Sequence, residues 1–437
     1  MKLTFYGGAG EVGRSCILIN SDKTRVLFDA GVKLGRTIEH PKIPAELIRS
    51  LDAIFVSHAH LDHIGYLPHL FSAGFKGSVY VTKPTLELGN VVVNDYMRIS
   101  EPKDVTKEGL SLMQKSFKVC EFKDEIKVGD MTFSFIPSGH IVGSSMITAD
   151  DGKHRLIYSG DFFLSHTKLL EGADTRNLHA NTLIIESTYG GKDNIFPSES
   201  VIAGNMMKSI KETILAGGKI IIPSFAVGRA EEILLLLDDY MNSGLIPKVD
   251  IYVDGMISKA MRIHRHNVIY CRKELQRRIL MSDYDPFRSP NFTDVEGKNE
   301  RSKIVKQTKS CVIVTTSGML TGGPILYYLP HLASDQKNKI ILVGYQAIGT
   351  RGRALQDGEK EIEIDRRKVK INMTVETHHL SAHADRKQLE ALVGKIKDLK
   401  SVYVVHGEIS RSEDLRTSIE AKGYKATVPS IGSEYTM

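Results

Sequence analysis

The residues with the clearest chemical potential lie in one short segment, His58-Ala59-His60-Leu61-Asp62-His63. Its imidazoles and carboxylate are side chains that bind borderline-soft divalent metals such as zinc. The histidines at i and i+2 point the same way from an extended segment, so both can contact one ion. Asp62 and His63 then face a second ion. Six residues cannot complete two coordination shells, so we expect further ligands from other parts of the chain.

Three other segments place a ligand-type residue just past a predicted strand. They are Ser138-Gly139-His140, Ser159-Gly160-Asp161 and His406-Gly407-Glu408. In each, a neighbouring glycine allows close approach of the backbone. A single histidine at a strand end is more often structural than metal-binding. Combined with the 58–63 cluster, however, these segments are candidates for the missing ligands.

The elements that position these residues change in character along the chain. Short strands dominate the first part, and predicted strand Ala53–Ser57 runs directly into the cluster. From about residue 195, strands such as Lys219–Pro223 alternate with helices such as Arg229–Met241, which predicts a doubly wound parallel sheet. Strand-rich character returns with a predicted strand at Val369–Thr377 and a helix at Arg386–Ile396. The pattern indicates a strand-rich domain interrupted by an α/β insertion.

Composition sets outer limits on function. A chain of 437 residues suggests two or three domains, and its 41% hydrophobic and 25% charged residues are typical of a soluble globular protein. No stretch is long and apolar enough to span a bilayer, and the N-terminus lacks a secretory signal, so we expect a cytoplasmic protein without a membrane partner. A net charge of +6 allows a polyanionic partner without requiring one. The four cysteines form no Cys-x-x-Cys pair, which argues against a cysteine zinc site.

One motif points to a different chemistry. Gly8-Ala9-Gly10-Glu11-Val12-Gly13 follows a predicted strand and fits a dinucleotide-binding fingerprint, with Asp29 at the appropriate later position. That fingerprint requires a helix immediately afterwards, but Cys16-Ile17-Leu18-Ile19 is typical of a strand. We therefore expect no NAD binding, and we expect these glycines to shape a loop beside the metal site.

Taken in order, the motifs resemble those of the metallo-β-lactamase superfamily and, within it, the β-CASP ribonucleases. That family includes the endonuclease subunit of the eukaryotic cleavage and polyadenylation factor and short archaeal and bacterial homologues without KH domains. The similarity extends over essentially the whole chain. Besides the 58–63 cluster, His140 and Asp161, it comprises Asp29 in Leu27–Gly31, Glu186 in Glu186–Gly190, Ser381–Asp385, His406–Glu408, Pro223–Arg229, Ser317–Met319 and Gly344–Thr350.

The resemblance implies an α/β fold. A metallo-β-lactamase αββα sandwich would comprise residues 1–194 and 372–437, and a doubly wound α/β β-CASP domain would be inserted at 195–371. The inserted domain would cover the metals and leave a cleft that admits single-stranded but not double-stranded nucleic acid.

The resemblance also implies a role for each site residue. One Zn²⁺ would be held by His58, His60 and His140. The other would be held by Asp62, His63 and His406, and Asp161 would bridge the two. Asp29 would orient a ligand imidazole, as metal-bound histidines usually require. Mn²⁺ could replace Zn²⁺, because imidazole and carboxylate ligands accept both.

The catalytic groups implied by the family are Asp62, Glu186 and His383. The metals would activate a water, His383 would protonate the departing 3′ oxygen, and Glu186 would keep that imidazole protonated. The products would carry 5′-phosphate and 3′-hydroxyl ends. Substrate phosphates would be bound by residues of the insertion and of the segment after it, namely Arg229, Ser317, Gly318, His379 and Ser381.

The implied function is endonucleolytic hydrolysis of single-stranded RNA in RNA processing or decay. RNA is favoured because RNA-acting relatives carry histidine at the position of His406, whereas DNA-acting relatives carry an apolar residue. The stretch His379–His383 is similar to that of exonucleolytic relatives, so a 5′→3′ exoribonuclease remains an alternative. A small-molecule hydrolase of thioesters or lactams would share the cluster but would have no use for the insertion or for His383. The family allows a homodimer or an RNA-processing complex as the assembly.

Overall fold

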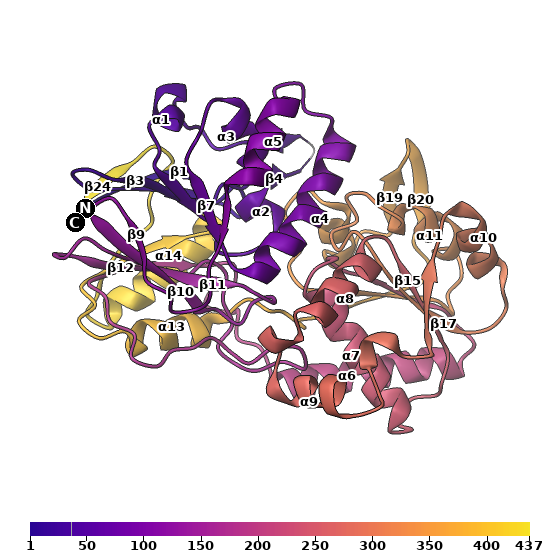
Figure 1. The fold of residues 1–437 in the computed structure, drawn as a ribbon. Coiled ribbons are helices and arrows are strands. Elements are labelled where there is room, and N and C mark those ends of the chain that lie inside the picture. Colours follow the sequence, from indigo (N-terminus) through magenta and orange to yellow (C-terminus); the bar gives the residue numbers. More distant parts are fainter. Residues whose placement is uncertain (36) are drawn as a thin grey trace. The chain divides into compact units, whose positions relative to one another are not determined.

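The computed structural model describes residues 1–35 and 37–437, and its internal contacts divide the chain into two compact units (Figure 1). Unit 1 comprises Met1–His166, Gly172–Ile195 and His383–Met437. Unit 2 comprises Thr167–Glu171 and Phe196–Ala382. The chain therefore leaves and re-enters unit 1 twice.

Unit 1 is built on two seven-stranded sheets. The first has the order β24 (Glu434–Thr436), β1 (Lys2–Gly7), β2 (Cys16–Asn20), β3 (Arg25–Phe28), β6 (Ala53–Phe55), β7 (Ser78–Val81) and β8 (Phe117–Val119). The second has the order β23 (Lys425–Thr427), β22 (Ser401–Val405), β13 (Thr182–Glu186), β12 (Arg155–Tyr158), β11 (Ser145–Asp150), β10 (Met131–Pro137) and β9 (Ile126–Val128). A small hairpin of β4 (Lys33–Leu34) and β5 (Ile38–Glu39) lies outside both sheets.

Aromatic residues fill the space between these sheets. Phe28 and Phe55 from the first sheet pack against Phe133 and Tyr158 from the second, with ring centroids 4.3 Å apart for Phe55 and Phe133. Successive side chains of a strand point to opposite faces, so in β2 Ile17 joins this core while its neighbours pack outward against helices. Burial of both faces explains why β2 is a continuous apolar run, and it confirms the strand predicted after the glycine-rich loop.

Helices cover the outer face of each sheet of unit 1, which confirms the αββα sandwich (Figure 1). The first sheet packs against α1 (Ala45–Arg49), α2 (Leu61–Ile64), α3 (Leu67–Ser72), α4 (Lys83–Ser100) and α5 (Lys107–Ser116). The second packs against α13 (Arg386–Lys395) and α14 (Ile409–Ala421). No helix among the described residues is long and apolar enough to cross a membrane.

Unit 2 contains a six-stranded parallel sheet with helices on both faces, as predicted for the insertion. Its order is β16 (Phe292–Val295), β15 (Asp250–Asp254), β17 (Cys311–Thr315), β14 (Ile220–Pro223), β18 (Lys339–Val343) and β21 (Thr374–His378). The helices are α6 (Glu199–Leu215), α7 (Arg229–Asn242), α8 (Ile257–His266), α9 (Lys273–Met281), α10 (Lys298–Lys306), α11 (Ile325–Leu332) and α12 (Arg351–Gln356). Short 3₁₀ turns at Val268–Tyr270 and Pro286–Arg288 and a hairpin of β19 (Glu361–Ile364) and β20 (Arg367–Lys370) complete it.

The predicted single strand Val369–Thr377 is wrong. Its first residues belong to β20, which pairs with β19, and its last residues belong to β21, which pairs with β18. The backbone is not in a strand at Ile371–Met373, where the chain passes from one sheet to the other. Alternating apolar residues indicate a strand but do not indicate which strand it pairs with, so the break between β20 and β21 could not be predicted from the sequence.

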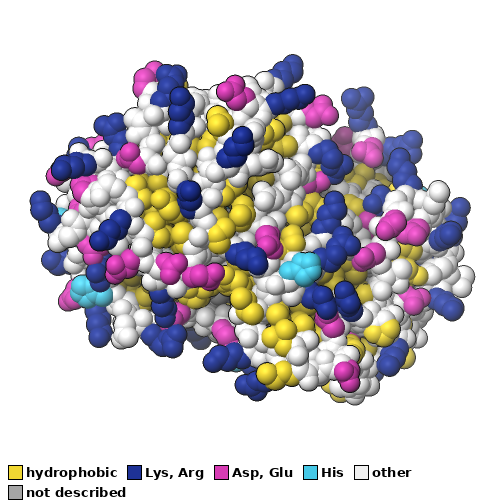
Figure 2. All heavy atoms as spheres, viewed as in Figure 1, with side chains coloured by type: hydrophobic (Ala, Val, Ile, Leu, Met, Phe, Trp, Pro, Cys, Tyr) yellow, Lys and Arg dark blue, Asp and Glu magenta, His cyan; other side chains and the backbone are white. Residues whose placement is uncertain are grey.

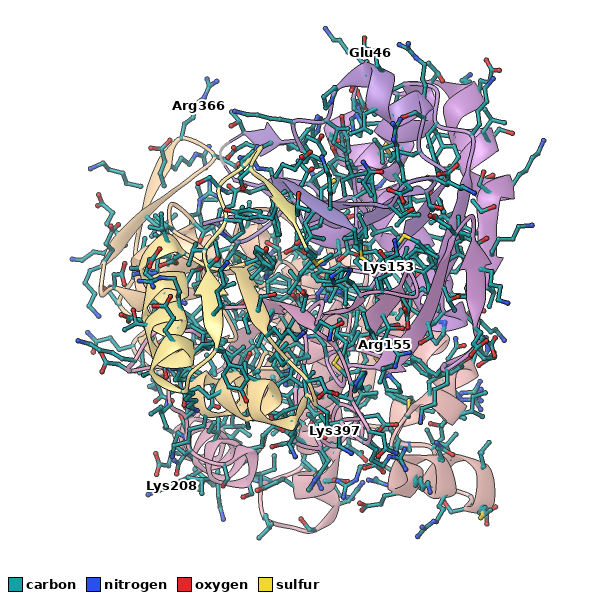
Figure 3. All side chains as sticks on the ribbon, turned by 90° about the vertical axis from the view of Figure 1, so that its left-hand side faces the viewer. Glu46, Lys153, Arg155, Lys208, Arg366 and Lys397 are labelled. Atoms are coloured by element: carbon teal, nitrogen blue, oxygen red, sulfur yellow. The ribbon has the colours of Figure 1, made fainter. Side chains whose placement is uncertain are left out.

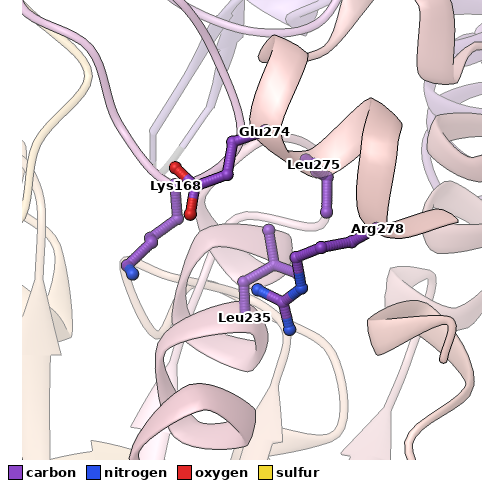
Figure 4. A pocket seen from close by; sticks show the side chains of 5 residues that line it. All are labelled: Lys168, Leu235, Glu274, Leu275 and Arg278. Atoms are coloured by element: carbon purple, nitrogen blue, oxygen red, sulfur yellow. The ribbon is translucent and has the colours of Figure 1, made fainter. Parts of the chain in front are cut away.

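The short segment Thr167–Glu171 is tied into unit 2 by hydrogen bonds and ion pairs. Glu232, in the first turn of α7, accepts the backbone N–H groups of Lys168 at 2.7 Å and Leu169 at 2.9 Å. The Lys168 ammonium lies 2.8 Å from Asp239. Figure 4 shows Lys168 beside α7 and α9, in a small hollow that it lines with Leu235, Glu274, Leu275 and Arg278. We call this segment the strap.

Charged side chains of both signs lie on the face of the molecule that Figure 2 shows. Figure 2 shows lysine and arginine side chains scattered over the viewed face with acidic ones among them. Lys153 and Arg155 stand at the turn between β11 and β12 (Figure 3), and Arg155 pairs with Asp150 at 2.7 Å. Exposed pairs of this kind contribute little stability, about 0–1 kcal/mol each.

The buried pair Glu231 and His264 of unit 2 predicts how stability depends on pH. Burial raises the pKa of Glu231 to about 8 from 4.5 and lowers that of His264 to about 4 from 6.5. Between pH 6.5 and 8, Glu231 binds more protons in the folded than in the unfolded state and His264 does not, so the contribution of Glu231 to stability falls as the pH rises. We expect the free energy of unfolding of wild type to fall by about 2 kcal/mol more than that of Glu231→Gln between pH 6.5 and 8. Urea unfolding of both proteins at pH 6.5 and 8 measures this, and parallel pH dependences would contradict it.

Candidate metal centre

The predicted metal ligands of unit 1 stand on loops that follow strand ends. His58 follows β6, His140 follows β10, Asp161 follows β12, and His406 follows β22 directly. His60 directly precedes the short helix α2, which contains Asp62 and His63. His406 has φ of +48° and Asp29 has φ of +59°, a left-handed conformation that non-glycine residues rarely adopt. Such conformations persist where surrounding structure enforces them, often at functional sites.

Three imidazoles and a carboxylate form the first group of ligand atoms. His60 Nδ1 lies 3.1 Å from both His58 Nε2 and His140 Nε2. Asp161 Oδ2 lies 3.4 Å from His58 Nε2 and 3.6 Å from His140 Nε2. Burial and nearby His63 hold the pKa of His58 well below its ordinary value, so this imidazole keeps a lone pair for a cation.

The second group shares Asp161 with the first. His63 Nε2 lies 3.4 Å from Asp161 Oδ2, and His406 Nδ1 lies 3.4 Å from Asp161 Oδ1. Asp62 Oδ2 is 3.2 Å from His406 Nε2. Each oxygen of Asp161 thus faces nitrogens of this group, while Oδ2 also faces the first group. The structure brings all seven predicted metal ligands together in two adjoining groups.

The residues present fit a pair of cations. Asp161 Oδ1 and His63 Nε2 are buried without a hydrogen-bond partner among residues 1–35 and 37–437, although both face neighbouring ligand atoms. Burial alone would raise the pKa of Asp161, but His406, His63 and other imidazoles lower it well below its usual range. Ionised carboxylates beside buried unpartnered nitrogens are costly unless a cation neutralises them. The donor set of imidazole and carboxylate suits divalent metals.

Asp29 holds one of these ligands in place. Its Oδ2 accepts hydrogen bonds from His63 Nδ1 at 2.6 Å, Ser57 Oγ at 2.7 Å and Tyr158 Oη at 2.8 Å. Its Oδ1 accepts the backbone N–H of Ser57 at 2.6 Å. The proton on His63 Nδ1 is thereby fixed, which directs the Nε2 lone pair towards Asp161. Sequence reasoning missed Ser57 and Tyr158; their only signal is that they precede His58 and Asp161 at strand ends.

Asp29→Asn is expected to weaken metal binding about 10- to 100-fold, the usual effect of removing a group that orients a ligand imidazole. The amide replaces one acceptor oxygen with a donor, so the carboxamide cannot accept all four hydrogen bonds. Competition for zinc against a fluorescent chelator measures the affinity. Ser21→Ala, which removes a surface hydroxyl bound to Asp130, is a control away from the centre. Equal zinc affinity in Asp29→Asn and wild type would contradict the role of Asp29.

A histidine–glutamate pair lies against the first group. His383 Nδ1 is 3.1 Å from Glu186 Oε2 and 3.9 Å from Asp161 Oδ2, and its ring centroid is 4.5 Å from that of His140. Glu186 Oε1 also accepts the backbone N–H of Phe162 at 3.1 Å, which fixes the carboxylate. Burial lowers the pKa of His383, but the carboxylates of Glu186 and Asp161 outweigh it and raise the pKa to about 9. His383 therefore carries a proton beside the ligand groups.

The predicted phosphate-binding residues of unit 2 follow the carboxyl ends of β14, β17 and β21, at the end of a parallel sheet where ligands bind. Gly318, after β17, lies against the backbone of Phe225, after β14, and a Cβ at this position would lie only 3.0 Å from the Phe225 backbone nitrogen. The Ser317 hydroxyl accepts the backbone N–H groups of Thr321 and Gly322 within its own turn. Arg229 is buried at the start of α7.

The remaining two predicted residues follow β21 at the same end of the sheet. Ser381 is buried, and its backbone N–H donates to the His379 carbonyl. The His379 ring stacks on Phe196 with centroids 4.3 Å apart.

Comparison with known proteins assigns the chain to a family. Family models match residues 9–209 (metallo-beta-lactamase superfamily), 230–355 (Beta-Casp domain) and 368–429 (Zn-dependent metallo-hydrolase RNA specificity domain). A curated relative from Methanocaldococcus jannaschii, named transcription termination factor FttA, is 39% identical over 98% of this chain and 70% of its own length. The chain belongs to the β-CASP family of the metallo-β-lactamase superfamily.

Other β-CASP relatives and a solved structure agree. A Thermococcus kodakarensis relative of the same name is 36% identical over 97% of this chain and 69% of its own length. A solved protein of unknown function from Enterococcus faecalis V583 shares the fold, with a TM-score of 0.59 and 16% identity over 100% of this chain and 99% of its own. Membership confirms the resemblance found in the sequence. This β-CASP chain is a metal-dependent hydrolase of a nuclease family with an RNA specificity domain.

Proposed function

We propose that this β-CASP protein is a two-zinc endoribonuclease that hydrolyses single-stranded RNA to 5′-phosphate and 3′-hydroxyl ends. The observation that carries the proposal is the juxtaposition of the two ligand groups with His383 and the Glu186 carboxylate that faces its ring. When bound, a pair of divalent ions would generate a nucleophile from water and neutralise charge on a phosphoryl oxygen. His58, His60 and His140 would hold one ion, Asp62, His63 and His406 the other, and Asp161 both.

The protein's own contribution to the chemistry is a proton. Phosphodiester hydrolysis leaves a 3′ alkoxide, which is a poor leaving group unless it is protonated as the bond breaks. His383 carries that proton, and Glu186 keeps the ring charged and oriented at 3.1 Å. The positive charge of cations held by Asp161 would lower the pKa of His383 from its raised value towards neutral pH, where an imidazole transfers a proton most effectively.

The substrate class follows from the family and from unit 2. A small-molecule thioester or lactam hydrolase would need no inserted sheet, whereas a polymer needs contacts along its backbone. Motifs at the carboxyl ends of β14, β17 and β18 present a surface for phosphates on unit 2. The archaeal relatives are named transcription termination factors, and we propose that transcripts are the RNA this chain cuts.

The test is a cleavage assay with single-stranded RNA labelled separately at each end, beside matched DNA and duplex RNA. We expect internal fragments from single-stranded RNA only, and loss of cleavage in His60→Ala and after chelation. Mononucleotides released from a 5′-monophosphate end would move the assignment to a 5′→3′ exoribonuclease. No cleavage by protein that holds two metals would overturn the nuclease proposal and favour a small-molecule substrate.

A further inference from the structure

Unit 1 contains another cluster of side chains that can bind a metal, outside the two ligand groups around Asp161. It consists of His40 in the loop after β5, His69 in α3 and Asp104 in the connection between α4 and α5. Each side chain offers one ligand atom, and these atoms lie within 4.8 Å of one another. Three segments far apart in sequence thus converge at one place, which we call the His40 group.

Contacts around the two imidazoles orient them. The His40 and His69 ring centroids are 4.3 Å apart, and the Tyr66 ring stacks on His69 at 5.0 Å. Tyr96 Oη lies 3.4 Å from His69 Nε2 and 3.5 Å from His40 Nε2. His69 Nδ1 lies 2.6 Å from Asp104 Oδ2. The rings are therefore held by aromatic packing and by a hydroxyl that faces both.

A hydrogen-bonded histidine–aspartate pair alone would need no metal. The chain contains such a pair at its surface, His179 with Asp398. The His40 group differs because a second imidazole is packed beside the first, and two charged rings at 4.3 Å would repel each other. Burial and His69 lower the pKa of His40, so at neutral pH its ring keeps a lone pair. The Asp104 side chain is 63% exposed, so an ion can arrive from solvent.

We propose that His40, His69 and Asp104 form a separate site for a divalent transition metal such as Zn²⁺, Ni²⁺ or Co²⁺, with water completing the coordination shell. Two imidazole nitrogens and one carboxylate oxygen are a donor set that these ions accept. The proposal is independent of the ribonuclease assignment, because none of its residues belongs to the two ligand groups around Asp161.

Binding of the ion requires one proton to move within His69. The ion takes the Nδ1 lone pair, so the proton that Nδ1 shares with Asp104 shifts to Nε2. That nitrogen already faces Tyr96 Oη at 3.4 Å, which can accept it. Metal-bound histidines usually donate their other N–H in this way. The Asp104 oxygen released from His69 becomes a ligand of the ion and so keeps a partner.

The site is linked to the loop beside the main centre. The His40 carbonyl accepts a hydrogen bond from Arg14 Nη1 at 3.0 Å, and Arg14 pairs with Glu11 at 2.6 Å. In the same loop, the Gly8 carbonyl accepts the backbone N–H of His406 at 2.6 Å. An ion that ties His40 to α3 and to Asp104 would therefore stiffen a loop that contacts a ligand residue of the main centre.

Metal stoichiometry tests the proposal. Wild type, His40→Gln, Asp104→Asn and the matched surface control His179→Gln are dialysed against Zn²⁺ and analysed by mass spectrometry. We expect His40→Gln and Asp104→Asn each to hold one zinc fewer per chain than wild type and His179→Gln. Titration with Co²⁺ should show the same lost equivalent by visible absorption. The increase in melting temperature caused by added zinc should be smaller in both variants than in wild type.

Each outcome bears on the proposal. Equal zinc content in all four proteins would overturn it, as would a loss in only one of two folded variants. If His40→Gln fails to fold by circular dichroism, Asp104→Asn decides, because its side chain is largely exposed. RNA cleavage is measured separately in the same preparations. If wild type does not cleave RNA but each variant holds one zinc fewer than wild type, the ribonuclease proposal is overturned and the His40 group is supported.

Discussion

Asp161→Asn is expected to lose about 10³-fold or more of RNA cleavage, because a metal pair contributes several kcal/mol to the transition state and 1.4 kcal/mol is tenfold in rate. The Asp161 carboxylate lies within 3.6 Å of ligand nitrogens in both groups. An amide keeps the shape but presents one oxygen and no charge. Zinc content should fall together with the rate, and both are measured on the same preparation.

The matched control is Asp398→Asn, which neutralises an exposed carboxylate that also pairs with a histidine. It should keep the wild-type zinc content and the wild-type rate. A folded Asp161→Asn protein that keeps the wild-type zinc content and cleaves RNA at the wild-type rate would show that the residue does not bridge metals.

His383→Gln is expected to slow RNA cleavage about 10²- to 10⁴-fold while leaving the zinc content unchanged, because positioned proton donors typically contribute that factor. The imidazole lies against Glu186 and Asp161 but belongs to neither ligand group. Glutamine can keep a hydrogen bond to Glu186 but cannot donate a proton to a departing oxygen.

A substrate with a better leaving group separates this role from a structural one. An aryl phosphodiester releases a phenolate that needs no proton, so His383→Gln should cleave it at nearly the wild-type rate. An equal loss on RNA and on the aryl ester would instead mean that His383 acts through the geometry of the site. His331→Gln, which removes an exposed imidazole on α11 of unit 2, is a suitable control for the histidine change.

Much of the centre could be predicted because its ligands lie in short, recognisable sequence segments. The 58–63 cluster is contiguous, and each remaining ligand stands within three residues of a strand end. The apolar runs of β6, β12 and β22 are buried on both faces and are easily recognised. The sandwich and the inserted parallel sheet followed from the change in periodicity near residue 195 and from the resemblance to β-CASP proteins.

What escaped prediction depends on long-range contact. The helices α5 and α14 are mostly polar and bury few apolar side chains, such as Met113 in α5 and Leu415 in α14, so their hydrophobic periodicity is weak. The break between β20 and β21 depends on which strands they pair with. The His40 group brings together three residues that are far apart in sequence, and its His69 and Asp104 are separated by 35 residues. No local sequence pattern therefore predicts it.

The strap has a consequence for the order in which the molecule is made. Residues Phe196–Ala382 form one continuous stretch of unit 2, so they leave the ribosome together and can begin to fold around the strap, which precedes them. Unit 1, in contrast, waits for its last segment, because β22 is an interior strand of its second sheet and carries His406 at its end. His383 also arrives only then. During synthesis the growing chain thus holds an incomplete set of ligands, and the centre that could cut RNA is assembled last.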